Sequence, residues 1–131
     1  MKKFLLMTFL VLLVGVLSQS AAAQIKERVR FAAGAHSKTV NGTVRGYAYH
    51  DYVIGASAGQ AMELKLNGSG MATVFSVFLP NGNNLDAATE SDDFSGELPV
   101  KGDYVIRVLM MRSAARRKGS VSNYTLKILV K

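Results

Sequence analysis

The sequence predicts an all-β fold, an antiparallel β-sandwich of about eight strands, and two observations lead to it. First, apolar residues recur at every second position in several short segments, as they do along strands that bury one face. Second, turn-forming pairs such as Asn41-Gly42, Ala58-Gly59 and Lys118-Gly119 separate these segments at the short intervals typical of sandwiches and barrels. No stretch beyond the N-terminal region shows the period of an amphipathic helix, so we expect one small β domain.

The first 23 residues have the features of a secretory signal peptide. Lys2 and Lys3 precede an apolar run at residues 4–17, and three alanines end at Ala23. The run is shorter than the roughly 20 residues that a membrane-spanning helix needs, although a retained anchor is the alternative. We expect cleavage after Ala23, which would leave a soluble, exported domain at residues 24–131 without membrane contact. The chain has no cysteine, so disulfides and thiol chemistry are excluded.

The alternating pattern also predicts which side chains form the core. Residues 72–79 form a continuous apolar run, which indicates a strand covered on both faces. Elsewhere the apolar residues alternate with polar ones, and each such set should face the space between two sheets. The predicted core contains Met62, Leu64, Leu66, Ile106, Val108, Tyr124, Leu126 and Ile128.

A basic cluster lies between the last two strand patterns, at residues 104–110 and 124–130. It consists of Arg112, Arg116, Arg117 and Lys118, at the tip of a predicted hairpin. A turn needs Gly, Asn or Asp for its backbone angles, but it does not need three arginines. Arginine suits forked pairing with carboxylates, so the cluster favours recognition of an acidic partner. The alternative is a charged loop that only keeps the surface soluble.

The overall charge agrees with an anionic partner. Loss of Lys2 and Lys3 lowers the 16 Lys and Arg residues to 14, against nine Asp and Glu, a net charge of +5. A basic surface speeds the encounter with an anionic partner without identifying it. Export and the lack of a nucleic-acid-binding motif argue against nucleic acid.

A second candidate surface lies at residues 43–49. If this segment is a regular strand, Thr43, Arg45, Tyr47 and Tyr49 share one exposed face. That arrangement would place two tyrosines near a cation on the surface. The alternative is that the tyrosines only cover the edge of a sheet.

The sequence offers no catalytic site, and we predict that the protein is not an enzyme and needs no cofactor. His36 and His50 have the neighbours Ser37 and Asp51, but adjacent strand residues point to opposite faces. We therefore expect both histidines to be solvated at strand ends.

An acidic group of residues raises the question of a metal. Its spacing does not fit the twelve-residue calcium loop, so we expect a solvated loop at residues 86–93, and metal binding there is left open. The group consists of Asp86, Glu90, Asp92 and Asp93.

Three segments carry a resemblance to a known family. They are "GYAYHDY" at residues 46–52, "YVIRVLMMRSAARR" at residues 104–117 and the closing "YTLKILVK". Over residues 29–131 the chain resembles the periplasmic inhibitors of goose-type (g-type) lysozyme. This resemblance implies a β-sandwich that is not an enzyme and that blocks the lysozyme cleft with a loop, protecting bacterial peptidoglycan from a host enzyme. It implies Tyr47, Arg112 and Arg116 as lysozyme-binding residues. Arg117 and Lys118, next to them in the sequence, are candidates for contacts at the rim.

The chain also resembles, more distantly, the pre-peptidase C-terminal β-sandwich domains of secreted enzymes. This second resemblance implies a polymer- or carbohydrate-binding module, and a periplasmic protein with a structural or solute-binding role is a third possibility. The preferred lysozyme type, the oligomeric state and the interface residues beyond Tyr47 and residues 112–118 are left open.

Overall fold

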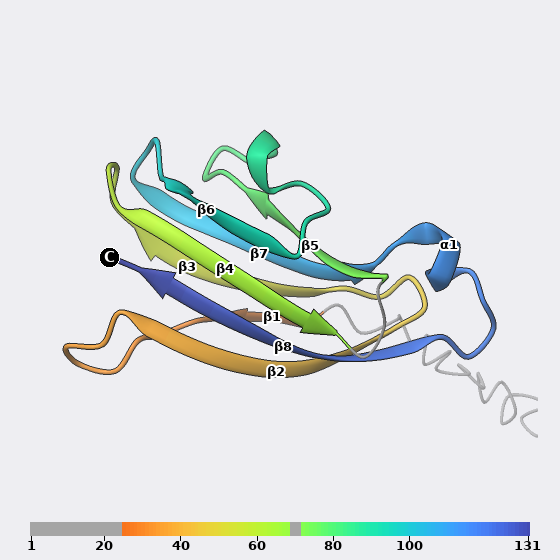
Figure 1. Ribbon diagram of the computed structural model, residues 1–131. Helices are drawn as coiled ribbons and strands as arrows, with labels where there is room; N and C mark the ends of the chain where they lie inside the picture. Colours follow the sequence, from red (N-terminus) through yellow and green to blue (C-terminus); the bar gives the residue numbers. More distant parts are fainter. Residues whose placement is uncertain (1–24, 69–71) are drawn as a thin grey trace, which may run out of the picture.

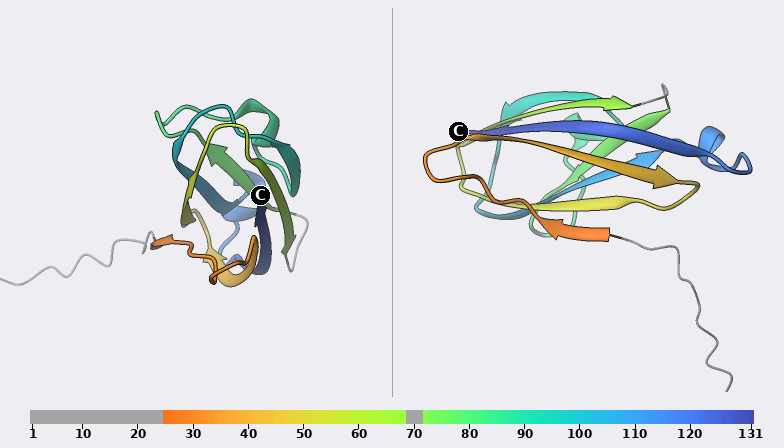
Figure 2. Two further views of the ribbon diagram at one scale, coloured as in Figure 1. Left: turned by 90° about the vertical axis from the view of Figure 1, so that its left-hand side faces the viewer. Right: turned by 90° about the horizontal axis from the view of Figure 1, so that it is seen from below.

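The computed structural model describes residues 25–68 and 72–131, and these form eight strands in two facing sheets (Figures 1 and 2). The predicted signal peptide at residues 1–23 lies outside the described residues. The first sheet has the order β1-β3-β7-β5, with β1 at Ile25–Arg28, β3 at His50–Ala56, β7 at Gly102–Met110 and β5 at Thr73–Phe78. The second has the order β2-β8-β4-β6, with β2 at Ser37–Arg45, β8 at Val121–Val130, β4 at Ala61–Gly68 and β6 at Asp93–Glu97.

The strand pairing is antiparallel, as predicted, with one difference. Strand β1 runs parallel to β3, and this N-terminal strand was not evident from the sequence because its residues are all exposed. Two short helical segments join the strands of the described part of the chain, η2 at Asp86–Ala88 and α1 at Arg112–Ala115. The predicted all-β sandwich is confirmed.

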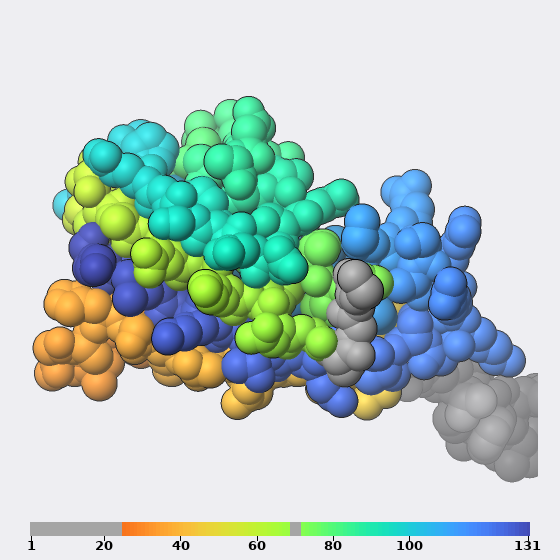
Figure 3. Space-filling model, in the orientation of Figure 1, coloured from red at the N-terminus to blue at the C-terminus, as the bar shows by residue number. Residues whose placement is uncertain are grey.

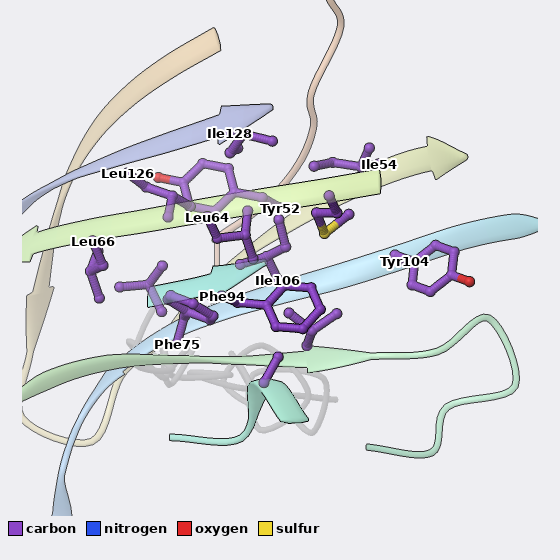
Figure 4. Close-up of a cluster of buried hydrophobic side chains, with 14 of the residues drawn as sticks. Tyr52, Ile54, Leu64, Leu66, Phe75, Phe94, Tyr104, Ile106, Leu126 and Ile128 are labelled. Carbon is purple, nitrogen blue, oxygen red and sulfur yellow. The ribbon is translucent and has the colours of Figure 1, made fainter. Parts of the chain in front are cut away.

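The predicted core is confirmed as well. All eight side chains expected there are buried between the sheets, together with rings from the first sheet such as Tyr52, Phe75 and Tyr104 (Figure 4). The hydroxyl groups of Tyr52 on β3 and Tyr124 on β8 lie 2.6 Å apart, so a hydrogen bond joins the two sheets inside the core. Burial raises the pKa of both phenols, which keeps them protonated and leaves one free to donate to the other.

The apolar run at residues 72–79 contains β5, and residues 73–77 of that strand are buried on both faces as predicted. Although β5 lies at the edge of its sheet, the segment that follows it folds back over that edge. Phe75 and Ser91 exchange two backbone hydrogen bonds of 2.7 and 2.9 Å, and the Leu85 amide donates to the Val77 carbonyl at 2.8 Å. The edge is therefore paired and protected from association with other strands.

One turn prediction was wrong. Asn41 and Gly42 lie in the middle of β2, where Gly42 is opposite Tyr124 of β8. A Cβ atom at position 42 would lie 2.6 Å from Cζ of Tyr124, too close for the two atoms to coexist. Glycine is thus required for the close approach of the tyrosine ring, not for a change of chain direction.

Candidate protein-binding site

The basic segment is not the tip of a hairpin, as the sequence had suggested. Strand β7 belongs to the first sheet and β8 to the second, so the segment between them crosses from one sheet to the other. Residues that face one core alternate in the same way whether two strands pair directly or lie in opposite sheets, and the pattern could not separate the two arrangements. The crossing contains α1, where the amides of Ala114 and Ala115 donate to the Met111 carbonyl at 3.0 and 2.9 Å.

We call residues 111–120 of this crossing the basic loop. Its four cations are all exposed. Within the described part of the chain, none of them forms an ion pair with an acidic residue. The backbone beneath them is well fixed, because Ala115 is buried and the Ser120 hydroxyl donates to its carbonyl at 3.1 Å. The basic loop projects from one end of the molecule (Figure 3). It therefore presents unpaired positive charge on a rigid support.

Arg112 and Arg116 leave this support in similar directions. The Arg116 amide donates to the Arg112 carbonyl at 3.1 Å, the bond that closes one turn of helix. Residues separated by four positions on a helix lie on the same side. The two guanidinium groups are thus suited to enter one cleft together.

Tyr47 lies in a turn and not on the strand face predicted for residues 43–49. The regular alternation ends at Arg45, where β2 ends, and Gly46 has a positive φ of 55° that a strand would not allow. Tyr47 is 67% exposed, the most exposed of the large hydrophobic side chains in the described residues. The Gly46 amide donates to the Ser120 carbonyl at 3.0 Å, so the Tyr47 turn is attached to the basic loop (Figure 1). The fold therefore brings Tyr47 and the four cations to the same end of the sandwich.

A cluster that the sequence analysis missed supports this end of the molecule. On the outer face of the first sheet, Arg107 of β7 pairs with Asp51 of β3 through two hydrogen bonds of 2.8 and 3.0 Å. Its guanidinium carbon lies 3.9 Å from the ring centroid of Tyr49 and 4.9 Å from that of Phe78. The bond to Asp51 raises the pKa of Arg107. Arg107, Asp51 and Phe78 come from three strands, and Tyr49 precedes β3, so the pairing of β7 with both β3 and β5 places them together.

His50 is buried, and the prediction that it is solvated was wrong. Its ring stacks on Tyr52 at a centroid distance of 4.2 Å, on the core side of β3. Burial lowers the pKa of His50, while the carboxylates of Glu27 and Asp51 oppose that shift. Its Nε2 has no hydrogen-bond partner and lies 3.7 Å from a Glu27 oxygen. Its Nδ1 lies 3.4 Å from the Tyr52 hydroxyl, so the ring packs between tyrosines of both sheets and forms part of the core.

The described residues contain no group of three or more His, Asp and Glu side chains that could hold a metal ion. Within residues 25–68 and 72–131, no helix is long and apolar enough to cross a membrane.

The fold and the exposed cations at one end make this a β-sandwich protein with a candidate binding site on its loops. No family model matches the chain. The inhibitor of g-type lysozyme from Escherichia coli K12 is 32% identical over 125 residues, which cover 92% of this chain and 93% of that protein. The crystal structure of PliG from Aeromonas hydrophila, a periplasmic lysozyme inhibitor of g-type lysozyme, shows 33% identity and a TM-score of 0.73 over 82% of this chain and 96% of its own.

The chain belongs to the family of inhibitors of g-type lysozyme. This is a family of proteinaceous inhibitors and not of enzymes. The pre-peptidase C-terminal domain of a Bacillus anthracis collagenase is also similar in structure, with a TM-score of 0.53 over 83% of this chain and 97% of its own. Its 12% identity shows a shared sandwich fold and nothing about function.

Proposed function

We propose that this protein is a periplasmic inhibitor of g-type lysozyme that inserts the basic loop into the enzyme's cleft. The observation that supports an inhibitory function is the 32% identity to the E. coli inhibitor along 92% of this chain. The exposed, rigidly supported basic loop supports the choice of inhibitory element. The protein acts by occupying the cleft and performs no chemistry itself.

Charge complementarity explains why arginine is suited to this task. Enzymes that hydrolyse glycosidic bonds usually keep one or two carboxylates in the substrate groove. The guanidinium groups of Arg112 and Arg116 reach such a groove from one side of α1 and pair with those carboxylates. Charge-assisted pairs of this kind are strong where the complex excludes water, and arginine binds both carboxylate oxygens at once.

Tyr47 contributes a different type of contact. Its exposed ring stands beside the basic loop and offers apolar area together with a hydroxyl group. Tyrosine and arginine are the residue types most often found at the energetic centres of protein interfaces. Arg117 and Lys118 lie further along the loop, and Lys118 should act as a rim charge that affects the association rate more than the affinity.

Export places the inhibitor where a host lysozyme attacks peptidoglycan. Residues 1–23 are the proposed signal peptide, and cleavage after Ala23 gives a mature domain of residues 24–131. The A. hydrophila structure is that of a periplasmic inhibitor, which agrees with the proposed location of this protein. N-terminal sequencing of the protein recovered from the periplasm tests the proposal, which fails if Met1 is still present.

Inhibition of bacterial lysis by a g-type lysozyme is the direct test of function. The wild-type protein in molar excess should stop lysis, and undiminished lysis would exclude the proposed function. Chicken-type and invertebrate-type lysozymes in parallel assays establish the preferred enzyme.

Alanine substitutions then test the site. Arg112→Ala and Arg116→Ala should each weaken binding by about 2 kcal/mol or more, because each leaves a carboxylate of the enzyme buried without its partner. Arg30→Ala is the matched control, since Arg30 is also exposed but lies before β2, at the far end of that strand from Arg45. If both loop variants bind like wild type, the basic loop is not the inhibitory element, and the lysis assay alone then decides the inhibitory function.

A further inference from the structure

A shallow hollow lies between the basic loop and the Tyr47 turn. Its volume is about 370 Å³, and its lining comes from the end of β2, the start of β8 and the last part of the basic loop. The residues are Arg45, Gly46, Arg117, Gly119, Ser120 and Val121. Two of them are arginines that are distant in the sequence, and the fold brings them to one depression.

The walls of the hollow are fixed by backbone contacts. Arg45 and Val121 are register partners where β2 meets β8, and the Gly46 amide bonds to the Ser120 carbonyl at 3.0 Å. The Ser120 amide donates to the Arg117 carbonyl at 3.1 Å, which holds the end of the basic loop against the strand. Gly119, at a φ of 74°, has no heavy atom within 4 Å of where a Cβ would stand, so space is open beside it.

The charge in the hollow is not compensated within the protein. Both arginines are exposed, and in the described part of the chain neither forms an ion pair with an acidic residue. Two guanidinium groups at one depression repel each other unless an anion lies between them. A carboxylate has the charge and the two oxygens that match them, whereas a larger apolar group would leave both cations desolvated and unpaired.

The floor of the hollow favours a side chain over a free anion. Val121 is 42% exposed there, which offers apolar surface to the methylene groups that carry a carboxylate. The depression also adjoins the Tyr47 turn and the basic loop, which the proposed function places in contact with the enzyme. The occupant is therefore part of the same protein partner.

We propose that Arg45 and Arg117 form a second anionic subsite, which receives one Asp or Glu side chain from the rim of the lysozyme cleft. This inference rests on the proposed function and adds Arg45, a strand residue, to the binding surface. The subsite is separate from the Arg112 and Arg116 pair that enters the cleft. Because an acid at the matching rim position is needed to fill it, the subsite selects among lysozymes that all have catalytic carboxylates.

Neutral substitutions test the subsite in the intact protein. Arg45→Gln and Arg117→Gln keep side-chain length and polarity but remove the charge. Each should weaken binding to a g-type lysozyme about 5- to 20-fold, less than the loss of a fully buried charge pair, because the hollow is open to water. Arg45→Lys should lose less than Arg45→Gln, while Arg30→Gln, the matched control, should change nothing. Thermal melts establish that each variant is folded.

A double-mutant cycle across the interface identifies the occupant. Each acidic residue on the rim of the lysozyme cleft is changed to its amide and measured against wild type and Arg45→Gln. One acid should show coupling, with the loss from the two changes together at least 3-fold smaller than the product of the separate losses. The same acid should couple to Arg117→Gln.

Two outcomes separate failure of this inference from failure of the proposed function. If Arg45→Gln and Arg117→Gln bind like wild type while Arg116→Ala is impaired, or if no rim acid couples to Arg45, the subsite is wrong and the basic loop stands as the inhibitory element. If wild type itself does not bind, the proposed function fails and the subsite fails with it.

Discussion

Replacing Arg107 by methionine should cause a large loss of stability, although Arg107 lies on the outer face of a sheet. The substitution keeps an unbranched stem but removes the guanidinium that pairs with Asp51 at 2.8 and 3.0 Å. The Asp51 side chain is 9% exposed and that of Arg107 is 32% exposed. The variant therefore leaves a carboxylate that is almost buried without its charged partner.

The magnitude follows from this burial. Removing one partner from a fully buried ion pair typically costs about 3–5 kcal/mol. Water can reach Asp51 through the space left by the partly exposed arginine, so the lower end of that range applies. Loss of the cation above the Tyr49 ring adds at most about 1 kcal/mol. The expected loss is about 3 kcal/mol, which lowers the melting temperature of a domain near 100 residues by roughly 10–15 °C.

Urea unfolding followed by tyrosine fluorescence measures this loss, since the chain has five tyrosines and no tryptophan. The denaturant slope should not change, because the variant unfolds the same surface. Adding Asp51→Asn to the Arg107→Met background should restore part of the stability, since no buried charge is then left unpaired. A loss below about 1 kcal/mol, or a double variant no more stable than Arg107→Met, would refute the reasoning.

Three further predictions concern the core and the surface. Gly42→Ala should destabilise the protein by about 2–4 kcal/mol in urea unfolding, because the added methyl displaces the Tyr124 ring from its hydrogen bond. Tyr124→Phe should lower the free energy of unfolding less in the Gly42→Ala background than in the wild-type protein, because the hydrogen bond that it removes is already lost there. Burial keeps the pKa of His50 below its ordinary value of 6.5, so only the unfolded chain takes up the proton as the pH first falls through 6.5. Unfolding free energy should decline with falling pH in that window, and a pH series on His50→Gln should lack this component. Arg28→Ala should leave the melting temperature nearly unchanged, since its ion pair with Asp103 is exposed on both sides and screened by water and salt.

The sequence predicted the core because burial on one face imposes a period of two on each strand. Met62, Leu64 and Leu66 could be assigned to the interior without any knowledge of which strand lies beside them. The pairing of strands has no comparable signature. Asn41-Gly42 has the composition of a turn, yet its glycine accommodates Tyr124, a residue distant in the sequence. The prediction for His50 was wrong for the same reason, since the two rings that cover it, Tyr52 and Tyr124, come from strands of both sheets.

The candidate site could be predicted only in part. Charge alone indicated Arg112, Arg116 and their neighbours, because a short connection has no structural need for so many arginines. The sequence placed Arg45 near two tyrosines on one predicted strand face, but nothing in it connected Arg45 with Arg117. Its relation to Arg117 arises from the β2–β8 register and from the path of the basic loop, neither of which local sequence determines.

Both segments of the candidate site are connections between sheets, which accounts for their rigidity. The Tyr47 turn leads from β2 in the second sheet to β3 in the first, and the basic loop leads from β7 in the first sheet to β8 in the second. Each is anchored at both ends in strands of the core, and the bond between Gly46 and Ser120 ties one to the other. Little conformational freedom is then left to lose when a partner binds, and that loss is one of the main costs of association. A sandwich of this kind can hold several exposed cations together although no acidic side chain pairs with them. The packed sheets, and not ion pairs, fix the positions of the loops that carry them.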